Sequence, residues 1–155
     1  MSEAEPSGIT RQRCREIMTK NVRTVTRDML VREVAAIMRD GDMGAVPVTD
    51  DGKLIGIVTD RDIVVRCIAD GRDADTSVSD AMTTELFTVS PDDFVFEAIR
   101  LMGDKQVRRV PVVDDNGKLA GIIAMADVAL ETEDDREIAE TLEEISSGAG
   151  YWGKS

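Results

Sequence analysis

The stretch AVPVTDDGKLIGIVT at residues 45–59 returns as RVPVVDDNGKLAGIIA at residues 109–124. In each copy, two runs of small and β-branched apolar residues flank a cluster of Asp and Gly, which predicts a β-hairpin. The repeat extends outward, because Ile17-Met18-Thr19 matches Ala81-Met82-Thr83 at an offset of 64 residues. One inserted residue, Asn116, shifts the offset to 65 inside the second hairpin. The chain therefore contains one structural unit twice.

Each copy has the order of a short strand, a helix, the hairpin and a second helix. The first copy has an extended piece at residues 22–25 and then a helix with the apolar stripe Leu30, Val34, Ile37 and Met38. In the second copy, Ser90 and Pro91 predict a helix that has Ser90 as its N-cap. The order indicates an α/β (α+β) fold of tandem β-α-β-β-α repeats. A unit this short buries too little surface alone, so we expect the repeats to pack together with pseudo-two-fold symmetry.

The same reasoning divides the chain into six segments. They are a disordered leader (1–10), repeat 1 (11–70), a linker (71–79), repeat 2 (80–130), an acidic amphipathic helix (131–147) and a flexible tail (148–155). In residues 131–147, Ile138, Leu142 and Ile145 form one narrow apolar stripe among many acidic residues. This helix either lies solvated on its own domain or docks on a sister subunit near the basic residues 11–27.

Composition excludes several classes of protein. The 155 residues carry a net charge of −12 and only 3% aromatic residues, which argues against a nucleic-acid partner. There is no His and there are only two Cys, so neither a common zinc site nor a disulfide framework is expected. No apolar run reaches the length of a membrane span, and we expect a cytoplasmic protein. Catalytic motifs are absent as well, which predicts that the protein is not an enzyme.

Chemistry is concentrated where the second hairpin strand runs into a helix. Thr59 and Asp62 place a hydroxyl and a carboxylate at this junction, where backbone N–H groups favour anions and a ribose diol would suit the Asp. Alternatively, Thr59 as N-cap and Asp62 as the third helical residue form a capping box that only stabilises the helix. In the second copy Ala124 replaces the Thr while Asp127 remains, which favours ribose binding.

The residues before the first hairpin strand differ between the copies. Arg108 and Arg109 stand in the second copy, where paired guanidiniums indicate a phosphate clamp or, alternatively, a solvated pair that neutralises nearby acids. The first copy has Gly44 and Ala45, which leave space for a flat ring. We therefore expect two non-equivalent sites. One site combines Asp127, Arg108 and Arg109 with an apolar slot from Val25, Ala45, Val46 and Ile123, and the other combines Thr59 and Asp62 with Val89 and Val110.

These features together resemble the CBS domain pair, or Bateman module, over residues 14–130. The resemblance is carried by the x-Met-Thr opening, the Val-Pro-Val strand and the Gly-Lys-Leu-x-Gly-Ile turn and strand, in order and twice, and by the Thr59-x-x-Asp62 ending, from which the second copy departs at Ala124. It implies a disc-like α/β fold, usually dimerised, with two clefts that bind ligands such as AMP, ADP, ATP, S-adenosylmethionine or NADH. With no effector domain fused, the chain is similar to small bacterial stress-associated CBS proteins.

The resemblance predicts a regulatory sensor of adenosine nucleotides of the AMP, ADP or ATP type. We expect a homodimer that acts through an unknown effector protein, requires no cofactor and binds the nucleotide as a regulatory ligand, with or without Mg²⁺. The alternative is a ligand-free CBS scaffold that mediates protein–protein interaction.

Overall fold

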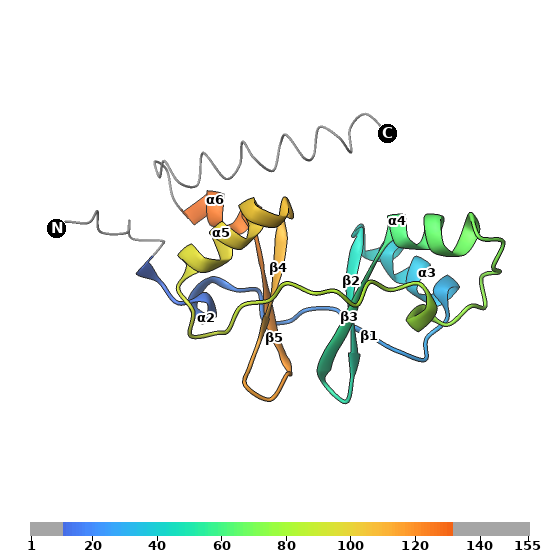
Figure 1. Ribbon diagram of the computed structural model, residues 1–155, viewed down its shortest axis with the longest axis horizontal. Coiled ribbons are helices and arrows are strands. Elements are labelled where there is room, and N and C mark those ends of the chain that lie inside the picture. Colours follow the sequence, from blue (N-terminus) through green and yellow to red (C-terminus); the bar gives the residue numbers. More distant parts are fainter. Residues whose placement is uncertain (1–10, 132–155) are drawn as a thin grey trace. The chain divides into compact units, whose positions relative to one another are not determined.

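The computed structural model describes residues 11–131 (Figure 1). The expected leader, the acidic segment after residue 131 and the tail lie outside the described residues. The chain forms two compact units. Unit 1 groups Met1–Val22, Phe87–Asp115 and Ala120–Ser155, and unit 2 groups Arg23–Leu86 with Asn116–Leu119. Helices and short strands alternate in both units, which confirms the expected mixed α/β fold.

Unit 2 is built on a three-stranded sheet in the order β1-β2-β3. Strand β1 is parallel to β2, with Val25 opposite Val48, and β2 is antiparallel to β3. The turn between β2 and β3 holds Asp51 and Gly52 at positive φ, as a tight hairpin requires. The elements are β1 (Val25–Thr26), α3 (Val31–Gly41), β2 (Ala45–Asp50), β3 (Lys53–Thr59), α4 (Asp60–Ile63), the π-helix η1 (Val64–Ile68) and the 3₁₀-helix η2 (Val78–Asp80).

Unit 1 repeats this plan on a smaller sheet. Strands β4 and β5 form the hairpin, and Val89 pairs with Val112 in parallel, at the place that β1 takes in unit 2. Helix α5 packs on β4, and α2 packs on α5. The elements are α2 (Cys14–Ile17), α5 (Val95–Lys105), β4 (Arg109–Val113), β5 (Leu119–Ala124) and α6 (Met125–Glu131).

Each unit has its own aliphatic core. In unit 2, helix α3 turns its buried face onto the sheet, and in unit 1 helix α5 does the same. Burial of these side chains is the main force that holds each unit together. The core of unit 2 includes Val25, Val31, Val34, Val46, Val48, Val58 and Ile63, and that of unit 1 includes Cys14, Val89, Val95, Ile99, Met102, Val110, Ile123 and Val128.

Each unit combines the body of one sequence repeat with the segment that opens the other repeat. The first N–H group of α3, that of Val31, donates to the carbonyl of Thr76 (2.8 Å), just before repeat 2. At the matching place in unit 1, the N–H group of Val95 donates to the carbonyl of Gln12 (2.8 Å), at the start of repeat 1. Helix N-termini leave such N–H groups without partners inside the helix, so each opening segment supplies an acceptor that its partner helix needs.

Two glycines allow the opening segments to approach the hairpins closely. Thr19 exchanges two backbone hydrogen bonds with Ile122, and Thr83 does the same with Ile57. A Cβ atom on Gly121 would lie 2.6 Å from the carbonyl oxygen of Thr19, and one on Gly56 would lie 3.0 Å from that of Thr83. The glycine of each Gly-Ile motif therefore lets the x-Met-Thr segment of the other repeat pack directly against the strand.

Helix α5 begins later than the sequence indicates. Ser90 is not its N-cap, because residues 90–93 close a separate turn in which the Ser90 N–H group donates to Asp93 Oδ2 (2.8 Å). Phe94 then stays extended and pairs with Arg13 in an antiparallel bridge, so the helix starts at Val95. Pairing with the opening segment of the other repeat thus competes with helix formation at Phe94. Sequence periodicity does not show this pairing.

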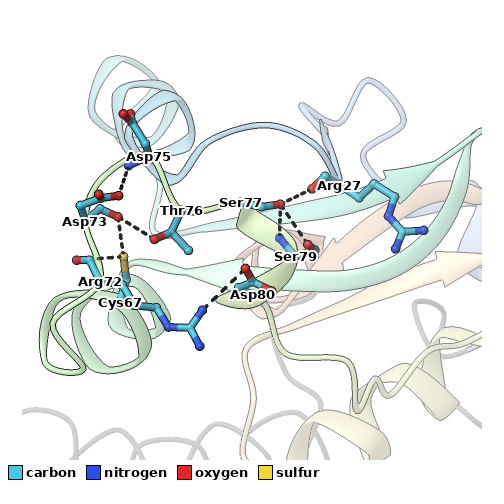
Figure 2. Close-up of polar contacts among 9 residues, drawn as sticks. All are labelled: Arg27, Cys67, Arg72, Asp73, Asp75, Thr76, Ser77, Ser79 and Asp80. Carbon is cyan, nitrogen blue, oxygen red and sulfur yellow. Dashed lines mark hydrogen bonds and ion pairs between the residues drawn. The ribbon is translucent and has the colours of Figure 1, made fainter.

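The segment between the repeats is firmly attached to unit 2 (Figure 2). Ser77 Oγ donates to the carbonyl of Arg27 (2.9 Å), and Thr76 Oγ1 donates to the carbonyl of Asp73 (2.7 Å). The thiol of Cys67, at the end of η1, lies 3.4 Å from the same Asp73 carbonyl. These contacts hold the linker in place up to η2, so the Met82-Thr83 segment leaves it from a fixed point.

We expect Gly121→Ala to lower the free energy of unfolding by about 3 kcal/mol, because the new methyl group would overlap a backbone carbonyl that cannot move aside easily. Urea unfolding followed by circular dichroism measures this. Gly41→Ala is the matched control, since its methyl group would meet only the flexible end of Met43. Its stability should stay within about 0.5 kcal/mol of the parent or rise slightly, as Ala favours helix. Equal losses for the two variants would contradict the close-approach interpretation.

The Cys14 thiol predicts a pH dependence of stability. Burial, with smaller contributions from Asp93 and Glu97, raises its pKa to about 12. In the unfolded chain the pKa is about 8.5. The folded state therefore holds the proton longer, and this stability is complete below about pH 8.5 and is lost as the pH rises toward 12. Unfolding free energies between pH 7 and 10.5 should fall more steeply for the parent than for Cys14→Ala, by up to about 1.4 kcal/mol per pH unit above pH 8.5. Parallel curves would refute this.

Candidate functional site

In each unit, three segments converge where the second hairpin strand runs into a helix. The N–H group of Asp60, the first residue of α4, donates to the carbonyl of Gly44 (2.9 Å). In unit 1, the N–H group of Met125 at the start of α6 donates to the carbonyl of Arg108 (2.8 Å). The residue before the first hairpin strand thus lies beside the start of the helix in both units. These two junctions, called junction 2 (in unit 2) and junction 1 (in unit 1), hold the polar residues that the sequence indicated.

Junction 2 contains the capping box. Asp62 donates its N–H group to Thr59 Oγ1 (3.0 Å), and Thr59 donates its N–H group to Asp62 Oδ2 (3.0 Å). Both bonds are partly buried. Together they form the capping box, which confirms the capping role that the sequence left as one of two alternatives for this pair. Ligand binding by the same carboxylate stays a prediction.

A third residue of junction 2 was missed by sequence reasoning. Thr83, in the exchanged opening segment, donates its hydroxyl to Asp62, with Oγ1 at 3.3 Å from each of the two carboxylate oxygens. The sequence marks Thr83 only as part of a repeated motif. No signal in the sequence links it to Asp62, because the two residues meet only after the opening segments are exchanged.

Junction 1 holds a carboxylate without such partners. Ala124 stands where Thr59 caps the helix in unit 2, and Asp127 is half-buried at the third position of α6. Within residues 11–131, no side chain or backbone group makes a hydrogen bond or an ion pair with the Asp127 carboxylate. The absence of a donor among these residues fits the sugar-binding role predicted for Asp127, which stays a prediction.

Arg108 and Arg109 lie at the start of the first hairpin strand of unit 1, next to junction 1. Both are exposed, and Arg109 begins β4. Neither forms an ion pair with a carboxylate of the described residues, so the alternative of a surface pair that neutralises nearby acids finds no support there. The backbone of Arg108 is fixed by its bond to Met125, two residues before Asp127. Junction 1 therefore combines two cationic side chains with one acceptor.

The electrostatic character of the two junctions is opposite. In junction 2, Asp60 and Asp62 supply two carboxylates against the one guanidinium of Arg61, and a Cβ atom on Gly44 would lie only 3.2 Å from Asp60 Oδ2. In junction 1, the matching positions are Met125, Asp127 and Arg108. An anion such as phosphate is therefore favoured less by the first arrangement than by the second. The expected non-equivalence of the two sites thus has a physical basis in each unit by itself.

The apolar residues predicted to form adenine slots lie mostly in the cores. Ala45 is half-buried, whereas the other side chains are buried, which gives them a packing role. Ile123 lies in unit 1 with Asp127, as proposed. The other predicted combinations join residues of different units, and they stay predictions. Val25, Ala45 and Val46 share unit 2 with Thr59 and Asp62, while Val89 and Val110 share unit 1 with Arg108, Arg109 and Asp127.

Metal-binding clusters and membrane-spanning helices were also sought. The described part of the chain has no group of three or more His, Cys, Asp or Glu side chains placed to hold a metal ion. None of its helices combines the length and the apolar character that crossing a bilayer needs.

Comparison with known proteins gives consistent matches along the chain. A family model described as the CBS domain matches residues 14–68 and again residues 78–134. The CBS domain-containing protein YhcV of Bacillus subtilis is 39% identical over 132 residues, which cover 85% of this chain and 94% of that protein. Hypoxic response protein 1 of Mycobacterium tuberculosis is 36% identical over 117 residues, which cover 74% and 81% of the two chains.

Solved structures of similar fold hold different ligands. Hypoxic Response Protein I with two coordinated zinc ions has a TM-score of 0.71 at 34% identity, covering 78% of this chain and 99% of that chain. CBSX2 in complex with AMP has a TM-score of 0.69 at 27% identity, covering 77% and 94%. The CBS domain pair of MJ0100, in complex with 5′-methylthioadenosine and S-adenosyl-L-methionine, has a TM-score of 0.66 at 26% identity, covering 77% and 94%.

The capping difference between the junctions gives a reciprocal prediction. Thr59→Ala should lower the free energy of unfolding by about 1 kcal/mol, because the Asp62 N–H group loses its acceptor. Ala124→Thr should raise it by a similar amount, since a Thr three residues before Asp127 completes a second capping box. Thermal unfolding of the two variants and the parent measures both shifts. A loss of stability in Ala124→Thr would show that junction 1 cannot accommodate the box.

Proposed function

The chain belongs to the CBS-domain family, and we propose on that premise that it is a regulatory module that binds an adenosine nucleotide and acts through a partner protein. The nucleotide is of the AMP, ADP or ATP type. The observation that carries the proposal is junction 1, where the Asp127 carboxylate has no bonded partner among residues 11–131 and Met125, two residues before it, donates its N–H group to the Arg108 carbonyl.

Junction 1 offers the two kinds of group that a nucleotide needs. A carboxylate accepts hydrogen bonds from the hydroxyls of a ribose, as acidic residues do in dinucleotide-binding folds. Guanidinium groups present several N–H donors in a plane and bind phosphate oxygens in pairs. Asp127 supplies the first kind, and Arg108 and Arg109 supply the second.

The ligands of similar CBS pairs support an adenosine compound and narrow the choice. CBSX2 is reported with AMP, and MJ0100 with 5′-methylthioadenosine and S-adenosyl-L-methionine. The three ligands share adenosine, but only AMP carries a phosphate. Since this chain is strongly acidic overall and yet places two Arg side chains at junction 1, we favour a ligand with phosphate groups.

A second candidate function is a ligand-free scaffold that mediates protein–protein interaction. The observation that favours it is junction 2, where Thr59, Asp62 and Thr83 bond to one another without any ligand. In that case the motif stabilises a helix and an opening segment and does nothing else. Junction 1 does not share this network, and for that reason we rank the scaffold second.

Other parts of the proposal rest on sequence and family likeness. The homodimer, the effector protein, any Mg²⁺ with the nucleotide, the cytoplasmic location and the absence of catalysis stay predictions. The acidic segment that could contribute to a dimer begins at the end of α6 and lies outside the described residues.

Nucleotide binding should raise the thermal unfolding midpoint. A ligand at 100 times its dissociation constant stabilises the native state by about 2.7 kcal/mol, provided that it does not bind the unfolded chain. We expect this shift with at least one of AMP, ADP and ATP, tested with and without Mg²⁺, and a smaller shift with S-adenosylmethionine and NADH. Asp127→Ala should abolish most of it, and Arg108→Ala should weaken AMP more than adenosine.

The matched control is Asp104→Ala, which removes the same charge from an exposed position at the end of α5. It should leave the ligand shift unchanged. No shift with any of the five ligands would overturn the nucleotide proposal and make the scaffold the leading function. A shift that survives Asp127→Ala would move the site away from junction 1.

A further inference from the structure

The Thr83 hydroxyl occupies a defined place on the Asp62 carboxylate. Its oxygen lies at the same distance, 3.3 Å, from Oδ1 and from Oδ2. An atom equally far from both oxygens lies in the plane that bisects the carboxylate, and a hydrogen-bond donor there approaches from the open edge, opposite the bond to Cβ. This edge is also the one that a vicinal diol uses when its two hydroxyls donate to the two oxygens of one carboxylate.

The rest of the Asp62 carboxylate is already in use. Oδ2 accepts the N–H group of Thr59 at 3.0 Å, within the capping box. A carboxylate has about four lone-pair positions, so a further donor can still be added at Oδ1. A bidentate sugar diol, in contrast, needs the shared edge, and Thr83 holds that edge.

The position of Thr83 is set by its backbone. Its N–H group donates to the carbonyl of Ile57 (2.8 Å), and its carbonyl accepts the N–H group of Ile57 (2.9 Å). The preceding Met82 lies against Gly56, where no Cβ atom fits. The bonded linker of Figure 2 fixes the segment at its other end. The backbone contacts therefore fix the place of the Thr83 hydroxyl beside Asp62.

Unit 1 supplies a natural comparison. Thr19 occupies the matching place, with the same pair of backbone hydrogen bonds to Ile122 (2.9 and 3.0 Å). Its side chain is exposed, however, and no described group bonds to the Asp127 carboxylate. Among the described residues, the same motif thus bonds to the carboxylate at junction 2 and not at junction 1.

We propose that Thr83 is an affinity-determining residue that competes with the sugar diol of a nucleotide for Asp62. This inference rests on the proposed function, which makes the two junctions nucleotide sites. Junction 1 binds first because no group of residues 11–131 holds its carboxylate edge. Junction 2 binds only when the Thr83 hydroxyl is displaced, so occupancy there changes the contacts of the opening segment that carries Thr83. Junction 2 therefore binds the nucleotide more weakly than junction 1, and binding there is coupled to the position of the linker.

The test measures AMP binding by isothermal titration calorimetry on the full chain carrying Asp127→Ala, which leaves junction 2 as the site. In this background, Thr83→Val removes the donor and keeps the shape, and it should raise AMP affinity about tenfold, as expected for the loss of a competing hydrogen bond to a charged group. Thr83→Ser retains the hydroxyl and should keep the lower affinity. Thr19→Val is the matched control and should change nothing.

A second ligand separates competition from a general structural effect. With 2′-deoxy-AMP, which has no vicinal diol, Thr83→Val should give no gain. An equal gain for both ligands, or no gain for AMP, would overturn the competition while the nucleotide function stands. If AMP binds neither junction in any variant, both this inference and the proposed function fail. Circular dichroism of each variant checks that the fold is kept, and Thr83→Ala replaces Thr83→Val if the latter does not fold.

Discussion

The N–H groups that begin the two long helices find their acceptors in the segment that opens the other repeat. Val31 donates to Thr76 and Val95 donates to Gln12, both at 2.8 Å. A buried helix start without acceptors would lose the free energy of several hydrogen bonds. Without the exchange, each helix would lack a partner, each Gly-Ile strand would lose the segment that covers it, and Thr83 would never meet Asp62. The fold and the site therefore depend on the same few backbone contacts.

The contrast between the junctions follows from a few replaced side chains on an identical backbone plan. Thr59, Gly44 and Asp60 in unit 2 correspond to Ala124, Arg108 and Met125 in unit 1. The first set stabilises its helix start internally and adds negative charge. The second set adds positive charge, and within residues 11–131 it leaves the Asp127 carboxylate without a bonded partner. One motif is thus bonded internally at junction 2, whereas at junction 1 its carboxylate has no bonded partner among residues 11–131.

Much of the fold could be read from the sequence, because the signals involved are local. The hairpins follow from Asp and Gly turns between apolar runs, and the capping box follows from Thr59 and Asp62 three residues apart. The start of α5 was wrong because Ser90 and Asp93 bond to each other and Phe94 pairs with Arg13. The exchange was out of reach for another reason. Two identical motif sets can pair within a repeat or between repeats, and the sequence is the same in both cases.

A chain with only one such repeat could not complete its own helix start, and it would need a second chain to supply the opening segment. In that two-chain form, every substitution would appear at both junctions at once. Tandem duplication turns the encounter of two molecules into a contact within one molecule, so the pairing no longer depends on protein concentration. It also frees each copy to vary alone. The replacement of Thr59 by Ala124 in one copy only is a change that a fused gene permits and a symmetric pair of identical chains forbids.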